Sequence, residues 1–310
     1  MNCSLKYCCT RIALFIWFYS TALLAMADYR FEVLGAHSGA FAERGSIAQD
    51  SSIQNTYYFS PVSTSDVPLV EAAFLAKSSY VGVGYQTSVD SNDDEQVVSL
   101  SGRAVIADRF FVDIARSDNS LSSGDTRDEG ENESIGLGWY FNDYSTLSLT
   151  YTSFDFNDGS NSGLARASND DLDSYTEFNV RSVFEEIDDH IAFEGFVGLG
   201  DGKVEGSVLN FGFSVDYYFN NRFSLGGGFA HGEGSGEALS ATSFLINTQL
   251  FISESLGLSM SYIITALDIA LEDQELSTTA EGDDASGDGE LTPALDDRLQ
   301  FFEIAVKARF

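Results

Sequence analysis

The sequence predicts an all-β chain that closes into a transmembrane antiparallel up-and-down β-barrel of about 14 strands, within a range of roughly 12–16. Apolar and polar residues alternate with a period of two in many separate segments. Very short connections alternate with longer acidic ones, and aromatic residues gather beside the short connections. Tight turns at one end and long loops at the other are typical of barrels in a bacterial outer membrane.

The alternation is clearest in segment 209–217, where every odd position is apolar and every even position is small or polar. Segments 135–139, 147–151 and 256–262 repeat this pattern. Because successive side chains of a strand point to opposite faces, each segment has one apolar and one polar face. A soluble sandwich would turn the apolar face inward, whereas a membrane barrel turns it towards lipid. The expected strands are 28–37, 50–59, 78–89, 96–106, 110–117, 133–141, 144–156, 173–184, 190–200, 204–219, 222–231, 238–252, 256–269 and 298–310.

The connections between these segments fall into two classes. The short ones are 107–109, 142–143, 220–221 and 253–255. The longer acidic or Ser/Gly-rich ones are 90–95, 118–132, 157–172, 232–237 and 270–297. We expect the short turns at the periplasmic end and the long loops at the extracellular end. An even number of strands would leave both ends of the barrel chain in the periplasm.

Aromatic residues form three clusters next to short turns. Their members are Phe110 and Phe111; Trp139, Tyr140, Phe141 and Tyr144; and Tyr217, Tyr218, Phe219 and Phe223. Because amphipathic rings favour the headgroup level of a membrane, these clusters predict a periplasmic aromatic girdle. Ordinary core aromatics beside hairpins would explain one such cluster well, but three poorly.

The N-terminal residues predict export from the cytoplasm. Lys6 and Arg11 precede an apolar run over 12–24, and Ala25-Met26-Ala27 offers small residues at the two positions that a signal peptidase reads. We therefore expect a cleaved signal peptide over 1–27 and a Gram-negative outer-membrane barrel over 28–310. A retained anchor is the alternative, but the apolar run is shorter than the ~20 residues that a spanning helix needs.

All three cysteines, at positions 3, 8 and 9, lie before the expected cleavage site. The mature chain would then hold no disulfide and no thiolate metal site.

The last expected strand alternates up to the final residue. Its apolar positions are Phe302, Ile304, Val306, Ala308 and Phe310. A terminal phenylalanine on an alternating strand resembles the signal by which the bacterial barrel-assembly machinery recognises its substrates. This machinery and the lipids and lipopolysaccharide of the outer membrane are the expected partners.

Segment 60–77 interrupts the alternation, with Pro61 and Pro68 around a polar stretch and one or two possible helical turns over 69–77. The run Tyr57-Tyr58-Phe59-Ser60-Pro61-Val62, followed by Pro68-Leu69 and by Glu71-Ala72-Ala73-Phe74-Leu75, resembles a motif of the general bacterial porins. This resemblance implies a passive outer-membrane pore.

The chain is strongly acidic, with 48 Asp and Glu against 16 Lys and Arg and a net charge of −32. Such a balance disfavours nucleic acid as a partner, because phosphate binding needs clustered Lys and Arg. Segment 270–297 holds ten acids and no Lys or Arg, and segment 118–132 holds five acids and only Arg127. These loops could concentrate cations, or bind divalent ions that bridge to lipopolysaccharide, or simply stay solvated.

One part of the most acidic loop resembles a calcium-binding loop. Asp284, Ser286, Asp288 and Gly289 match its first half, but Leu295 occupies the position of the closing glutamate. Asp284 and Asp288 are therefore only weak metal candidates, and no cofactor is expected.

The phase of each strand predicts which charged residues face the lumen. They are Arg30, Glu32, Arg103, Asp113, Glu177, Asn179, Arg181, Glu194, Asp216, Glu303, Lys307 and Arg309. Six acids and five bases in this set make the wall nearly balanced in charge. Opposed charges could form a constriction with a transverse field, or could be wall salt bridges that satisfy one another. Because a slip of one residue reverses a face, each placement depends on register.

Catalysis has little support, because His37, His190 and His231 are scattered along the chain. The expected function is passive diffusion of small hydrophilic solutes with a cation preference. The alternative is a structural or adhesive barrel whose lumen is plugged by 118–132, 157–172 or 270–297. A hydrolase, the third class, would need His37 or His231 beside inward-facing acids at the rim.

Overall fold

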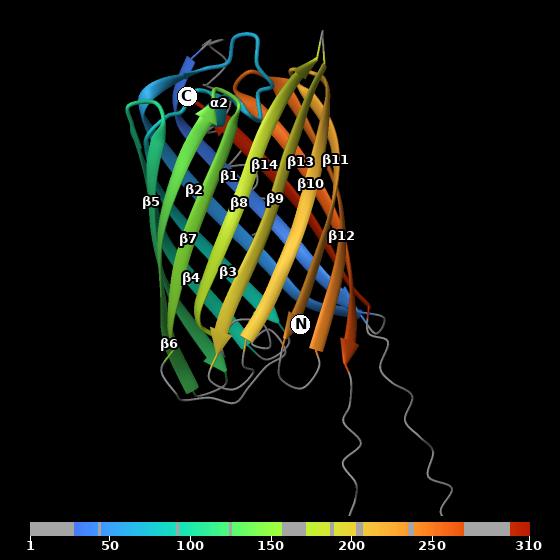
Figure 1. The fold of residues 1–310 in the computed structure, drawn as a ribbon. Coiled ribbons are helices and arrows are strands. Elements are labelled where there is room, and N and C mark those ends of the chain that lie inside the picture. Colours follow the sequence, from blue (N-terminus) through green and yellow to red (C-terminus); the bar gives the residue numbers. More distant parts are fainter. Residues whose placement is uncertain are drawn as a thin grey trace, which may run out of the picture.

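The computed structural model describes residues 28–42, 45–90, 93–123, 126–156, 172–186, 189–202, 207–234, 239–269 and 298–310. They form a closed barrel of fourteen antiparallel strands, in which each strand pairs with its neighbours along the chain (Figure 1). The first strand pairs with the last and closes the ring. The all-β barrel predicted from the alternation is confirmed. Among the described residues, no helix is both long enough and apolar enough to span a membrane.

The strands, in chain order, are β1 Asp28–Ala42, β2 Gly45–Ser63, β3 Tyr80–Asp90, β4 Asp93–Ile106, β5 Phe110–Ser123, β6 Thr126–Asn142, β7 Ser145–Phe156, β8 Leu172–Glu186, β9 Asp189–Gly202, β10 Ser207–Asn220, β11 Phe223–Gly234, β12 Leu239–Ser253, β13 Leu256–Ile269 and β14 Arg298–Arg309. A single helical turn, α2 (Ala72–Leu75), lies between β2 and β3. We call the end of the barrel that carries Asp28 and Phe310 the turn end, and the opposite end the loop end.

Several strands extend further towards the loop end than the sequence predicts. The connection expected over 118–132 is mostly paired, because β5 continues to Ser123 and β6 begins at Thr126. Serine, asparagine and aspartate are poor strand formers in isolation, so composition marked this stretch as a loop. In the barrel the described residues 118–123 and 126–132 pair across the ladder, and this pairing overrides local preference.

The outer surface is an apolar belt. Its most exposed side chains include Val83, Leu100, Ile114, Leu137, Leu149, Leu199, Phe244, Ile246 and Ile252. These side chains occupy alternate positions of their strands, as a lipid-facing surface requires. The opposite face of each strand therefore lines the interior of the barrel.

The aromatic clusters beside the turns are divided between the two faces, which corrects the prediction that all their members form one girdle. Phe110 is 54% exposed on the outer surface, whereas its neighbour Phe111 is 3% exposed inside the barrel. Tyr140 and Tyr218 are likewise buried in the interior. Adjacent residues of a strand point to opposite faces, so a consecutive aromatic run cannot lie wholly at the membrane surface. The outward members are Phe110, Trp139, Phe141, Tyr144, Tyr217, Phe219 and Phe223.

Side-chain oxygens cap the tight turns at the turn end. Asn142 Oδ1 accepts a hydrogen bond of 2.8 Å from the Tyr144 amide, and Asn220 Oδ1 accepts the equivalent bond of 2.8 Å from the Arg222 amide. Ser253 Oγ accepts one of 3.3 Å from the Ser255 amide. Asn and Ser favour such turns because their short side chains bond to the backbone two residues on.

The turn between β4 and β5 is different, because Ala107 and Asp108 both have positive φ, at 51° and 55°. The Arg109 amide donates to the Ile106 carbonyl at 3.2 Å, so these two residues are the centre of a hairpin turn of the mirror-image type. Alanine is strained in this conformation, because its Cβ approaches the following carbonyl oxygen.

We expect Ala107→Gly to increase the free energy of unfolding by about 1 kcal/mol, because glycine removes this steric cost. Urea unfolding of the purified barrel in detergent would measure the change. Ala115→Gly, in the middle of β5, is the matched control and should decrease the free energy of unfolding by about 0.5–1 kcal/mol. A decrease for Ala107→Gly as well would contradict the assignment of strain to this turn.

Candidate functional site: the barrel lumen

The inner face carries eleven of the twelve side chains that the alternation assigned to it. They are Glu32, Arg103, Asp113, Glu177, Asn179, Arg181, Glu194, Asp216, Glu303, Lys307 and Arg309, which the strand register places opposite other inward positions. Placement on the inner face is a matter of geometry, so the role of these residues in a conducting path stays a prediction.

Arg30 is the exception and corrects the sequence-based placement. The register of β1 against β2 shifts between Tyr29 and Phe31, and the amides of Arg30 and Phe31 both donate to the Phe310 carbonyl. This β-bulge inserts one residue and changes the phase of the strand. Tyr29 therefore points inward, while Arg30 is exposed and donates to the Phe59 carbonyl at 3.3 Å.

Three wall salt bridges, formed with two carboxylates, occupy three of the inward bases. Arg103 on β4 binds Asp113 on β5 through two bonds of 2.7 and 2.8 Å, the bidentate geometry that a guanidinium favours. Glu32 on β1 binds Arg309 at 2.9 Å and Lys307 at 3.3 Å, both on β14. Arg103 is thereby neutralised by its partner on the neighbouring strand, whereas Lys307 and Arg309 share the single carboxylate of Glu32.

The acids on the wall formed by β8, β9 and β10 have neutral partners instead of bases. Glu177 accepts a hydrogen bond from the Tyr175 hydroxyl at 3.5 Å, Glu194 accepts one from Asn179 at 3.1 Å, and Asp216 accepts one from Asn247 at 2.8 Å. These donors are neutral. Within the described part of the chain, none of these three acids forms an ion pair, so this wall keeps their negative charge.

Arg181, the base on this same wall, is paired with a residue that no strand supplies. Its Nη2 lies 2.6 Å from Glu71 Oε2, and the Tyr218 hydroxyl donates to Glu71 Oε1 at 2.7 Å. Glu71 belongs to the connection between β2 and β3, over residues 64–79, which we call the strap. Glu71 is only 2% exposed, so its carboxylate is buried inside the barrel.

The strap crosses the lumen from one wall to the opposite wall. β3 and β10 are seven positions apart in a ring of fourteen strands, which is half of the circumference. The Leu69 amide donates at 2.9 Å to the carbonyl of Asn221, in the turn that follows β10. Lys77 Nζ lies 2.7 Å from Asp143 Oδ1 in the turn between β6 and β7, and this contact lowers the pKa of Asp143. In Figure 1, α2 accordingly lies at the end of the barrel that holds the C-terminus.

Apolar contacts fix the strap on both sides. Ala72 packs in a cluster with Tyr29, Tyr58 and Val62 on the wall of β1 and β2. Phe74 packs in a second cluster whose members come from the opposite wall: Phe111, Tyr140, Val183, Ala192 and Tyr218. The turn end of the barrel therefore contains a hydrophobic core.

Among the described residues, the segment that enters the lumen is the strap, which the sequence does not predict as a plug. The alternative of a plugged barrel named 118–132, 157–172 and 270–297, all at the loop end; 118–132 is mostly strand, and 157–171 and 270–297 lie outside the described residues. Helical turns were expected over 69–77, and only Ala72–Leu75 is helical. One signal was available: the strap is a long, mostly apolar connection with one central acid, at the end where every other connection was expected to be short.

Inward aromatic rings lie flat against the wall, because a glycine stands on the neighbouring strand. A Cβ built on Gly138 would overlap the ring of Phe111, and one on Gly198 would overlap Tyr175. Gly212 stands in the same relation to Phe196, and Gly257 to Phe251. A side chain at these positions would push the ring towards the centre of the lumen.

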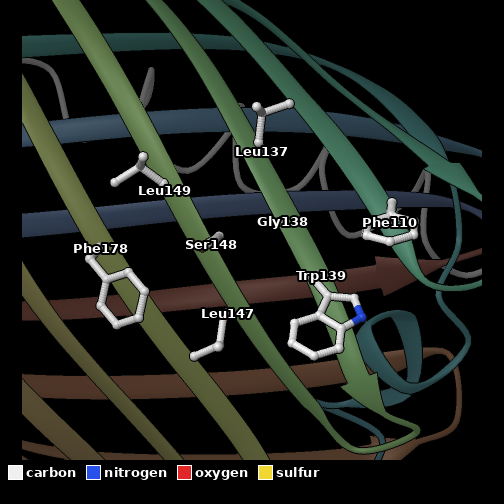
Figure 2. Close-up of a pocket in the computed structure, with 8 residues that line it drawn as sticks. All are labelled: Phe110, Leu137, Gly138, Trp139, Leu147, Ser148, Leu149 and Phe178. Atoms are coloured by element: carbon white, nitrogen blue, oxygen red, sulfur yellow. The ribbon is translucent and has the colours of Figure 1, made fainter.

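A shallow groove lies on the outer surface of the barrel. Figure 2 shows its lining, which is apolar on four neighbouring strands: Phe110, Leu137, Gly138, Trp139, Leu147, Ser148, Leu149 and Phe178. Because the large side chains of this lining belong to the apolar belt, the groove is part of the lipid-facing surface and offers no polar group for chemistry.

Neither His37 nor His231 faces the lumen at the loop end, whereas His190, at the turn end, pairs with Tyr218 on the inner face. His37 contacts Ser51 at 3.0 Å and His231 contacts Thr242 at 2.9 Å, in both cases on the outer face. In the described ranges, no group of three or more His, Asp or Glu side chains is placed to hold a metal ion. Asp284 and Asp288 fall outside the described residues, as do the three cysteines.

Comparison with known proteins gives the family of this barrel. Residues 11–278 match the family described as "Putative general bacterial porin". The chain belongs to this porin family. The resemblance seen around Tyr57–Leu75 is thereby confirmed, and the chain is an outer-membrane channel. A search of curated proteins found no match.

Two solved structures share the fold of this porin. The outer membrane protein Omp33 of Acinetobacter baumannii is 18% identical, with a TM-score of 0.57 over 92% of this chain and 99% of that chain. The CymD monoaromatic hydrocarbon channel is 9% identical, with a TM-score of 0.56 over 91% of this chain and 89% of that chain. At these identities the likeness concerns the fold alone.

We expect Gly138→Ala to decrease the free energy of unfolding by about 1–3 kcal/mol, because Phe111 would be forced into the apolar cluster around Phe74. Urea unfolding in detergent would measure the loss. Gly227→Ala is the matched control: it lies on the outer face of β11, where an added Cβ meets only the Leu245 carbonyl oxygen, at 3.4 Å. Equal losses for both variants would contradict a specific role for Gly138.

Proposed function

We propose that this porin allows the passive diffusion of small hydrophilic solutes and ions across the outer membrane, with a preference for cations. The observation that carries the preference is the pairing of the inner wall. Arg103, Arg181, Lys307 and Arg309 are each bound to a carboxylate, whereas the acids of the β8–β10 wall have neutral partners. A passing ion therefore meets unbalanced negative charge on one side of the lumen.

The physical basis of the preference is electrostatic. Negative charge inside a narrow aqueous passage with low-dielectric walls raises the local concentration of cations and lowers that of anions. Glu194 and Asp216 are diagonal neighbours on β9 and β10, since Glu194 pairs with Ser214 and Asp216 pairs with Ala192. Their fields add in the same part of the lumen.

Exclusion by size would act at the periplasmic end. The strap occupies the middle of this end, between its two apolar clusters. Solutes must pass beside it, so its position would set the upper limit of solute size. The hydrocarbon channel among the structural neighbours is named for an apolar solute, whereas the charged inner wall of this chain supports hydrophilic ones.

The acidic segment 270–297 would add to the cation preference at the extracellular mouth and bind divalent cations that bridge to lipopolysaccharide. Export would use the signal peptide over 1–27. Assembly would use the outward face of β14, where Phe302, Ile304 and Phe310 are exposed and Val306 is partly exposed. Chains without residues 1–27, or with Phe310 substituted, would test export and assembly separately.

A structural barrel without conductance is the second candidate, because the strap fills part of the lumen. Planar-bilayer recordings of the full-length chain, purified from the outer membrane of an expressing bacterium, separate the two. Stable conductance steps support the channel. A folded barrel that gives no steps under any condition supports the structural role.

We expect the triple variant Glu177→Gln, Glu194→Gln and Asp216→Asn to reduce the ratio of cation to anion permeability by about two-fold, because it removes the unbalanced wall charge. The reversal potential in a salt gradient measures this ratio.

The matched control neutralises three acids on the outer face of the barrel, Asp118→Asn, Glu131→Gln and Glu133→Gln, which surround Arg116. This control should leave the reversal potential nearly unchanged. A variant with the acids of 270–297 neutralised reports the contribution of the mouth. Selectivity that responds to neither the wall nor the mouth variant would overturn the proposed preference.

A further inference from the structure

We propose that the strap, residues 64–79, is a periplasmic gate of the pore, and that the buried carboxylate of Glu71 is the latch that holds it closed. This inference rests on the proposed function, because a gate requires a pore that conducts. The strap is longer than a turn between β2 and β3 requires, and its buried acid has no role in the pairing of the barrel strands.

The latch is the strongest polar contact between the strap and the opposite wall. Glu71 receives one hydrogen bond from the Arg181 guanidinium, at 2.6 Å, and one from the Tyr218 hydroxyl, at 2.7 Å. A buried carboxylate is tolerated only when charged and hydrogen-bonding partners compensate for its lost hydration. The closed position therefore depends on both donors.

The wall does not depend on the strap. β2 and β3 pair with each other from Tyr58–Tyr80 to Ala48–Asp90, so their ladder is complete where the strap leaves the wall. Among the described residues, the only backbone hydrogen bond from the strap to the opposite side joins Leu69 and Asn221. The strap can therefore leave the lumen while the barrel stays closed.

Arg181 has a second acid next to it on the wall, so Glu71 can leave without leaving Arg181 unpaired. Glu194 on β9 is the direct cross-strand partner of Arg181 on β8. When Glu71 leaves, this acid can neutralise the guanidinium, so that opening does not leave a buried charge unpaired. A two-state element needs two such satisfied arrangements.

Two residues near the ends of the strap have the backbone conformation expected of hinges. Asp66 has φ 60° and Lys77 has φ 49°, both in the left-handed region. These residues flank α2 on either side. Because this conformation costs free energy in residues other than glycine, a change of φ at both ends would relax strain on opening.

The contact of Lys77 with Asp143 is a peripheral tie rather than a second latch. The Asp143 side chain is 81% exposed, and ion pairs of exposed residues contribute little because water and salt screen them. This contrast supplies a matched control, since both pairs join the strap to the far wall but only one is buried.

The first test compares Glu71→Gln with Asp143→Asn in planar-bilayer recordings. We expect Glu71→Gln to lower the ratio of closed to open time by about ten-fold, because the buried charge-assisted contact is lost. Tyr218→Phe, which removes one of the two hydrogen bonds, should have a smaller effect in the same direction. Asp143→Asn should gate as the wild type does. Wild-type gating in both Glu71→Gln and Tyr218→Phe would overturn the latch.

The second test locks the strap with a cross-link, Leu69→Cys with Asn221→Cys. No cysteine follows position 9 in the sequence, so the new pair is the only one in the expected mature chain. Under oxidising conditions the locked porin should stay at its lowest conductance, and reduction should restore wild-type openings. This variant keeps Glu71, so it tests the gate even where Glu71→Gln fails to fold. A cross-linked porin that opens like the reduced one would overturn the gate.

The planar-bilayer recordings distinguish a wrong gate hypothesis from a wrong channel hypothesis. Cation-selective steps that no strap variant alters would refute the gate and leave the channel function intact. Absence of steps in the wild type, in Glu71→Gln and in the reduced cross-link variant would refute both. Steps that appear only in Glu71→Gln would support both, with a wild type that is closed under the conditions used.

Discussion

The pairing of β1 with β14 is the constraint on which the rest of this structure depends. In a membrane every backbone amide and carbonyl must find a partner within the protein, and a closed ring of strands meets this demand without a free edge. Closure gives each strand a lipid-facing side and an inner side, so the period-two alternation becomes an apolar belt outside and a polar wall inside. The bulge at Arg30 sits at this seam, where the first strand accepts the last residue of the chain.

The inner side of the barrel holds two environments. At the turn end the strap brings its own apolar residues and builds a core from Phe74, Phe111 and Tyr140, with a single buried acid at its centre. The same aromatic residues would have been costly in an open aqueous lumen, and the strap makes their burial favourable. Glycines on neighbouring strands keep inward rings against the wall elsewhere, as Gly212 does for Phe196.

The proposed cation preference depends on which charged side chains of the inner wall form ion pairs, rather than on the total charge of the chain. The chain has a net charge of −32, and the inner wall, with Arg30 excluded, carries six of the predicted acids against four bases. Its bases are held in ion pairs, one of them by the strap, while Glu177, Glu194 and Asp216 have only neutral donors. Arg181 connects the two parts of the lumen, because it neighbours both the latch acid and the wall acid Glu194. Selectivity and gating thus share one guanidinium.

The sequence by itself indicated a barrel of about fourteen strands, within a range of 12–16, and the face of nearly every charged residue assigned to the wall. These properties are local, because they follow from a period of two along each strand. Only the tertiary structure decided the partners of those charges, the phase change at Arg30 and the destination of the strap. Such features depend on residues far apart in the chain: Glu71 meets Arg181 and Tyr218 only because the ring closes and sets their strands opposite β3. The alternation within a segment carries no information about contacts between distant segments. The sequence therefore showed Glu71 only as part of a family motif and did not predict its partners.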